Sequence, residues 1–113
     1  MKYLMFICGD ENLALSPEET AAINTATDAW VREATARGVR LDGNRLARTD
    51  AATTVRARNG EVLVTDGPFA ETREQVGGYD VLECADLDEA LEIAAAHPVA
   101  KIGTIELRPF WGQ

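Results

Sequence analysis

The sequence predicts one α+β domain in which two helices cover one face of an antiparallel sheet. Helix-start signals stand at Ser16-Pro17-Glu18-Glu19 and at Asp86-Leu87-Asp88-Glu89. Each lies between strand-like apolar segments, and an Asn-Gly turn adds a hairpin between the two units. A length of 113 residues fits a single domain over 1–113. Together these features predict a ferredoxin-like β-α-β-β-α-β order with an inserted β-hairpin.

The first half of the chain is predicted to form a strand, a long helix and a second strand. Residues 2–8 are apolar in both alternating sets, which predicts a strand buried on both faces. The first helix is expected over about residues 17–37, with Gly38 as its C-terminal cap. Its apolar stripe consists of Ile23, Ala26, Trp30 and Ala34. Residues 39–48 are expected to contain the second strand, with a turn or bulge at Asp42-Gly43-Asn44.

The middle of the chain carries the hairpin. Asn59-Gly60 separates two strand-like runs, residues 53–58 and 61–65, and both turn positions tolerate the positive φ angles of a type I′ turn. Asp66-Gly67-Pro68-Phe69 ends the second run abruptly.

The last third of the chain repeats the strand, helix, strand order. A strand is expected at Tyr79–Cys84, directly after Gly77-Gly78. The second helix is expected over about residues 87–97, with Pro98 ending it. Its predicted apolar face consists of Leu87, Ala90, Leu91 and Ala94. Residues 103–108 form the last predicted strand, in which Thr104, Glu106 and Arg108 alternate with apolar residues.

Two helices can cover only one face of the sheet, which leaves the other face open. Two β-α-β units with right-handed crossovers place both helices on the same side. Because the first strand is apolar on both sides, the uncovered face would be an apolar patch that monomers seldom expose. We therefore expect a homodimer that pairs through this sheet face. The space between the two sheets would be a natural small-molecule pocket.

Composition narrows the possible partners. The chain is 46% hydrophobic and 27% charged, which is typical of a folded domain, and its net charge is -8. An acidic protein is poorly suited to nucleic acid or to an anionic membrane, so neither is expected as a partner. The apolar run at residues 3–8 is too short for a signal-peptide core or a membrane span, which favours a cytoplasmic location.

No motif predicts a cofactor or a metal site. The chain has one histidine, and Cys8 and Cys84 lack metal-ligand spacing, so free thiols are expected. Glycine-rich dinucleotide and phosphate motifs are absent, as are the zinc-protease helix motif and the serine elbow.

A stretch of the second half resembles a known family. The stretch is Thr65-Asp66-Gly67-Pro68-Phe69-Ala70-Glu71-Thr72-Arg73-Glu74-Gln75-Val76-Gly77-Gly78-Tyr79. It is similar to the signature of the YCII-related family, in its DGPF-domain subgroup. The resemblance extends over almost the whole chain, through Met1-Lys2-Tyr3-Leu4, His97-Pro98 and Ile105-Glu106-Leu107-Arg108-Pro109. It implies a dimeric α+β barrel, an active site made of a histidine and an aspartate, and a link with extracytoplasmic-function sigma factors.

His97 and an aspartate are the candidate catalytic residues. His97 is the only side chain whose ordinary pKa lies near neutrality, and in the last turn of a helix its protonated form would be favoured. Asp66 is the first candidate to orient it and Asp80 the second. The alternative for His97 is a helix-end residue that satisfies carbonyl groups. For Asp66, the alternative is that the Asp-Gly-Pro-Phe segment is a rigid corner.

Four charged residues are candidates for binding a substrate: Arg108, Glu106, Glu71 and Arg73. The alternation of the last strand points Glu106 and Arg108 into the inter-sheet space, where they would suit a small carboxylated or phenolic compound. The alternative for Glu71, with Arg73 or Arg108, is a surface ion pair.

Three functions fit these observations. The first is a cofactor-free enzyme doing acid–base or lyase-type chemistry with His97 and an aspartate. The second is a module that binds a small ligand without chemistry, and the third is an interaction protein acting beside a transcription factor.

Overall fold

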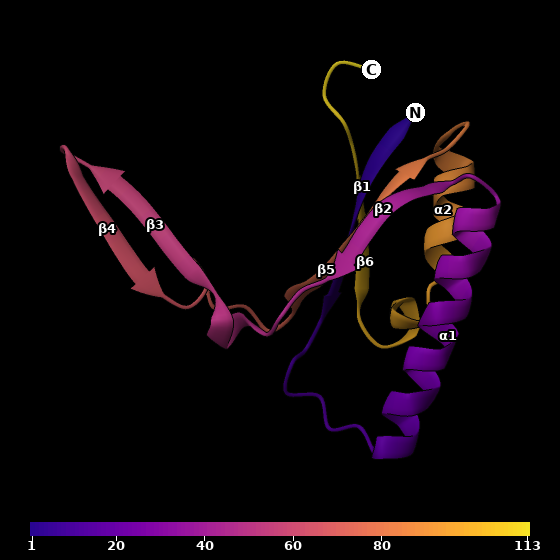
Figure 1. Ribbon diagram of the computed structural model, residues 1–113, viewed down its shortest axis with the longest axis horizontal. Helices are drawn as coiled ribbons and strands as arrows, with labels where there is room; N and C mark the ends of the chain where they lie inside the picture. Colours follow the sequence, from indigo (N-terminus) through magenta and orange to yellow (C-terminus); the bar gives the residue numbers. More distant parts are fainter.

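The computed structural model describes residues 1–113 as a mixed α+β protein with two antiparallel sheets and two helices (Figure 1). The elements are β1 (Lys2–Gly9), α1 (Pro17–Ala36), β2 (Arg40–Arg45), β3 (Thr53–Arg58), β4 (Glu61–Asp66), β5 (Gln75–Glu83), α2 (Leu87–Ala95) and β6 (Thr104–Pro109). Two short 3₁₀ turns, η1 (Thr49–Ala51) and η2 (Pro98–Lys101), complete the chain.

The main sheet has the strand order β2-β5-β1-β6, and every neighbouring pair is antiparallel. This order is consistent with the ferredoxin-like fold that the sequence predicts, with β3 and β4 as an added two-stranded sheet. Both helices lie on one face of the main sheet, and the other face carries no helix (Figure 1). That open sheet face has Leu4 and Phe6 at its centre, opposite Val81 and Tyr79 of β5.

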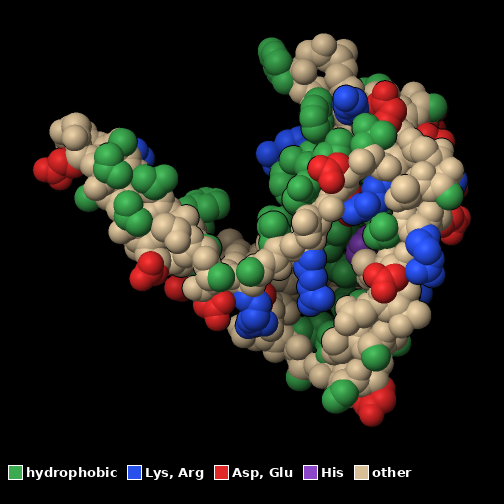
Figure 2. Space-filling model, in the orientation of Figure 1, with side chains coloured by type: hydrophobic (Ala, Val, Ile, Leu, Met, Phe, Trp, Pro, Cys, Tyr) green, Lys and Arg blue, Asp and Glu red, His purple; other side chains and the backbone are tan.

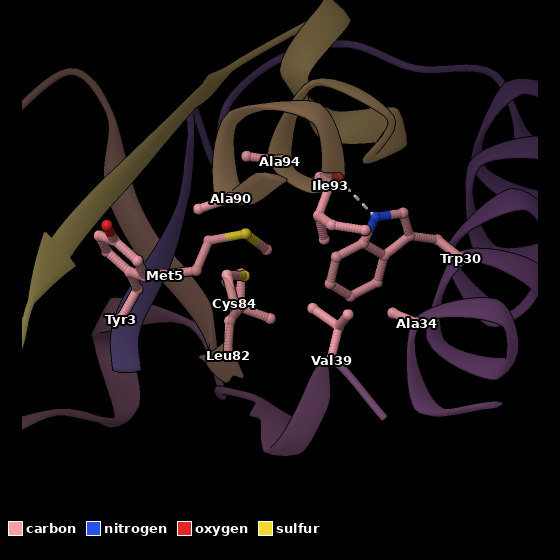
Figure 3. Packing of buried hydrophobic residues seen from close by; sticks show 10 residues of the cluster. All are labelled: Tyr3, Met5, Trp30, Ala34, Val39, Leu82, Cys84, Ala90, Ile93 and Ala94. Atoms are coloured by element: carbon pink, nitrogen blue, oxygen red, sulfur yellow. Dashed lines mark hydrogen bonds between the residues drawn. The ribbon is translucent and has the colours of Figure 1, made fainter. Parts of the chain in front are cut away.

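The core lies between the helices and the sheet (Figure 3). Its ten buried residues are Tyr3, Met5, Trp30, Ala34, Val39, Leu82, Cys84, Ala90, Ile93 and Ala94. Trp30 of α1 joins the two helices, because its Nε1–H donates to the Ile93 carbonyl at 2.9 Å. The indole nitrogen thus keeps a partner while the ring fills the core.

Helix α1 begins as predicted, but its stripe is only partly buried. Ser16 Oγ accepts from the Glu19 N–H, and Glu19 Oε1 accepts from the Ser16 N–H, each at 3.1 Å. Gly38 follows the helix with φ +73°, which glycine adopts without strain. Trp30 is buried, whereas Ala26 is exposed, because α1 packs on the core through its C-terminal half.

Helix α2 is shorter and rotated relative to the prediction. It ends at Ala95, so His97 lies beyond it, and Pro98 opens the turn η2. Proline disfavours the helical conformation of the residue that precedes it, which explains why α2 ends before His97. Leu87 and Leu91 are both 51% exposed, and the buried face is Ala90, Ile93 and Ala94 instead.

The segment Gly77-Gly78, which is expected to precede a strand, lies within one, and β2 contains Gly43. β5 begins at Gln75 and includes Gly77-Gly78, with a bulge opposite the Ile7/Cys8 step of β1. A Cβ on Gly78 would lie 3.1 Å from the Asn44 carbonyl oxygen, so the glycine lets β2 come close. Gly43 lies inside β2, after an irregularity between Arg40 and Asp42.

The hairpin of β3 and β4, residues 53–66, projects away from the body as an arm (Figure 1). Its turn is the predicted one, with Asn59 at φ 52° and Gly60 at φ 78°. Because of the arm, the radius of gyration is 16.1 Å, against about 13 Å for a compact chain of this length.

Candidate functional site

His97 is the most enclosed polar side chain of the helix layer. Its side chain is 2% exposed and packs edge-on against Trp30, with ring centroids 4.8 Å apart. The residue caps η2, because its Nδ1 accepts from the Val99 N–H at 3.1 Å. Nδ1 therefore serves as an acceptor, which leaves the proton of the neutral ring on Nε2. His97 Nε2 is the one buried side-chain nitrogen or oxygen without a hydrogen-bond partner.

Burial lowers the pKa of His97 from its ordinary 6.5 to about 4. The prediction of a raised pKa at a helix end is wrong, because the ring lies beyond α2 and is shielded from water. At neutral pH the imidazole is thus uncharged and can donate a hydrogen bond from Nε2. It is a poor cation and a weak base under those conditions.

A hollow in the surface lies in front of His97, whose ring stays 2% exposed. Figure 2 shows the only histidine, in purple, at the base of a recess that opens between the β2 edge of the sheet and α1. The N-terminal half of α1 stands off the core here, with Ile23 and Thr27 only half-buried. The hollow therefore lies beside the less tightly packed half of α1.

Asp80 and Arg40 form an ion pair on the helix side of the sheet. Arg40 Nε donates to Asp80 Oδ1 at 2.6 Å, and Asp80 is 3% exposed. Burial raises the pKa of Asp80, and the hydrogen bond from Arg40 partly offsets that shift. Gly43 makes room for the pair, because a Cβ there would lie 2.2 Å from Asp80 Oδ1. Asp80, the second candidate to orient His97, is thus paired with Arg40 through a hydrogen bond and an ion pair.

Asp66 lies far from the helix layer within one chain. It ends β4, pairs with Thr53 across the arm and is exposed (Figure 1). The next residue, Gly67, has φ +95°, and its N–H donates to the Ala52 carbonyl at 2.7 Å. Thr54 Oγ1 donates to the Gly67 carbonyl at 2.8 Å. These bonds make the Asp-Gly-Pro-Phe segment the corner at which the arm leaves the body.

Glu106 and Arg108 lie on the open sheet face, opposite to His97. Their neighbours Ile105 and Leu107 pack against the core, so the alternation predicted for the last strand is present. Arg108 Nη2 donates to Glu106 Oε2 at 2.7 Å, and its guanidinium lies 5.5 Å from the centre of the Phe6 ring. The sheet therefore separates these two residues from His97 within one chain.

Glu71 and Arg73 lie on the exposed segment between the arm and β5. The structure gives no ion pair between Glu71 and either Arg73 or Arg108. Arg73 lines a shallow concavity of about 550 Å³. The other residues around that concavity are Asp10, Leu13, Thr72, Glu74 and Ile102. All of its lining residues except Asp10 are exposed, so it is a groove in the surface and not an enclosed pocket.

Sequence reasoning missed the contribution of Arg40 and Gly43. The available signal was an aspartate placed two residues before Leu82 in an apolar strand, which puts its carboxylate on the core side. A buried carboxylate requires a cation or donors nearby. The partner could not be chosen from the sequence, because it depends on the register between β2 and β5.

The structure contains neither a metal-binding cluster nor a helix that could span a membrane. No group of three histidine, cysteine or acidic side chains lies close enough together to hold a metal ion. Neither helix has the length and apolar character needed to cross a membrane.

The fold and the site define a small α+β protein with ferredoxin-like strand order and a buried, uncharged histidine between helix and sheet. The sequence matches the model of the YCII-related domain over residues 1–112. It is also 39% identical, over 115 residues, to a protein of Rhizobium meliloti (strain 1021) named as uncharacterized. That alignment covers 96% of this chain and 91% of the other. The chain belongs to the YCII-related family, as its resemblance predicted.

Proposed function

We propose that this protein binds a small molecule through an acceptor oxygen that takes a hydrogen bond from His97 Nε2–H. The observation that carries the proposal is the unpartnered Nε2 of a 2% exposed imidazole. A buried donor without a partner costs about 1–3 kcal/mol, so such groups persist mainly where something else pairs with them. A carbonyl, carboxylate or phenol oxygen in the hollow of Figure 2 would supply that partner.

The test uses the fact that the chain has one histidine. Small carboxylates, phenols and ketones would be screened by NMR for shifts of the His97 ring signals. His97→Asn keeps the side-chain acceptor for the Val99 N–H but removes the Nε2 donor. We expect it to weaken binding of a hit about tenfold, the usual worth of one hydrogen bond.

The matched control for the ligand test is Arg108→Gln, on the opposite side of the sheet. It should leave the affinity of the hit unchanged. If Arg108→Gln abolished binding and His97→Asn did not, the ligand would lie on the open sheet face, and the His97 proposal would be wrong.

Catalysis without a cofactor is the second candidate function. Its support is that two buried groups on the helix side, His97 and Asp80, have pKa values shifted in opposite directions, lowered for His97 and raised for Asp80. Such opposite shifts are typical of sites where a carbonyl is polarised and a proton is moved. Asp80 replaces Asp66 as the proposed carboxylate, because Asp66 is on the arm. Turnover of a bound hit that His97→Asn removes would support this function over simple binding.

The protein is further proposed to be a homodimer that pairs through its open sheet face as a dimeric α+β barrel. The accessible surface is 7855 Å², against about 6,100 Å² for a compact monomer of 12.2 kDa. The surplus of about 1,800 Å² is ample for the roughly 800 Å² that each partner buries in a standard interface. The stretch from Thr65 to Tyr79 also supports placing the chain in the DGPF-domain subgroup.

Sedimentation equilibrium at micromolar concentration tests the dimer. We expect the mass of two chains for the natural protein and of one chain for Phe6→Lys, which puts a charge at the centre of the open sheet face. Leu91→Lys is the control, because Leu91 is also apolar and is 51% exposed but lies on α2. A single-chain mass for the natural protein would contradict the dimer.

A further inference from the structure

The arm has two chemically different faces. Residues that pair across the two strands lie on the same face, so Val55 shares a face with Val64, and Ala57 with Val62. The opposite face carries Arg56 beside Leu63, and Arg58 beside Glu61. One face is therefore apolar and the other charged, which is the pattern of a strand pair with one buried side.

The apolar face of the arm has no partner within the chain. Val55, Val62 and Val64 are 65–68% exposed. β3 and β4 form a sheet of their own, and the hydrogen bonds from Gly67 N–H to Ala52 and from Thr54 to Gly67 join the two ends of the arm to each other and not to the main sheet. An isolated two-stranded hairpin is marginally stable in water. The well-formed arm therefore requires a surface from outside the chain.

The direction of the arm indicates where that surface is. The arm leaves the body on the side of the main sheet that carries no helix (Figure 1), and the space-filling view shows a wide V between the arm and the body (Figure 2). Six residues per strand make the arm about 20 Å long, and packed sheets lie about 10 Å apart. A copy that covers the open sheet face would thus fill the V and lie beside the arm.

We propose that the arm is exchanged between two copies of this chain, so that the valine face of each arm packs on the copy covering its open sheet face. This inference rests on the homodimer proposed above. The accessible surface of 7855 Å² fits it, since the surplus of about 1,800 Å² per chain is that of a large obligate interface. The arginine face would remain in water, where its charges need no partner.

The test compares two double variants of the arm, each of which places a glutamate opposite a lysine on one of its two faces. Val55→Glu with Val64→Lys removes the apolar face but places opposite charges across the strands, which supports the hairpin itself. Arg56→Glu with Leu63→Lys makes the same kind of change on the charged face and is the matched control. Sedimentation equilibrium of the full chain gives the dimer dissociation constant for each variant. Hydrogen exchange reports the protection of the arm amides.

We expect the first variant to weaken the dimer at least tenfold and to remove slow exchange from β3 and β4, and the control to change neither by more than about threefold. If the natural protein is a dimer and the two double variants have the same dimer dissociation constant, the arm exchange is wrong, while the sheet-face dimer still stands. A natural protein of one-chain mass would overturn both. A natural tetramer that the first variant converts to a dimer would overturn the placement, because the arms would then join dimers.

Discussion

Lowering the pH from 7 to 4 is expected to remove about 3 kcal/mol from the free energy of unfolding through His97 alone. The pKa of the buried ring is about 4, while an exposed histidine in the unfolded chain titrates near 6.5. Because the folded-state pKa is the lower one, the stability is fully present above pH 6.5 and is lost as the pH falls toward and through 4. The difference of about 2.5 units corresponds to about 3 kcal/mol.

Urea unfolding at a series of pH values measures this loss, and NMR of the single histidine gives its pKa directly. In His97→Asn the slope between pH 6.5 and 4.5 should flatten, although the smaller side chain lowers stability at every pH. Asp80 works in the opposite sense, since its raised pKa stabilises the folded state as the pH falls below that value. A histidine that titrates near 6.5 in the folded protein would contradict the buried, neutral ring.

Gly103→Ala is expected to destabilise the protein by about 3 kcal/mol. A Cβ at this position would lie 2.2 Å from the Cys8 carbonyl oxygen and 3.1 Å from Val99 Cγ1. The first contact is with the backbone of β1, a central strand, which cannot rotate away as a side chain would. The strand and the turn η2 must move apart instead, which also disturbs the cap that His97 forms.

Gly9→Ala is the matched control for Gly103→Ala. Gly9 is also in the main sheet, as the last residue of β1, but a Cβ there meets nothing within 4 Å. We expect its free energy of unfolding, measured in urea, to stay within about 0.5 kcal/mol of that of the natural protein, as for an ordinary surface change. Equal losses in the two variants would show that glycine flexibility, and not the contact with β1, determines the effect.

Much of the fold could be predicted because its signals are local. Ser16 and Glu19 define the start of α1 by their own hydrogen bonds, and Asn59-Gly60 defines the hairpin turn by its backbone angles. The end of α2 was misjudged by two residues, because helical spacing continues to His97 in the sequence while Pro98 limits the backbone before it. The faces of Leu87 and Leu91 depend on how α2 sits on the sheet, which no local signal specifies.

The candidate site was predictable only in part. His97 stood out as the single titratable group near neutrality, but its low pKa results from burial under Trp30 and could not be inferred from position at a helix end. Arg108 and Glu106 were placed on the correct side of the last strand by alternation. That the sheet lies between them and His97 depends on the direction of the η2 segment, which is a property of the folded chain.

The strand order has a consequence for how the chain can fold. β1 pairs with β5 and with β6, so that Tyr3 lies opposite Pro109. Pairings this distant in sequence are slow to form, whereas β3 and β4 are joined by two residues and can meet within microseconds. The arm can therefore form transiently before the sheet that carries it, whereas the apolar side chains of β1 stay unpaired until β5 and β6 have been synthesised.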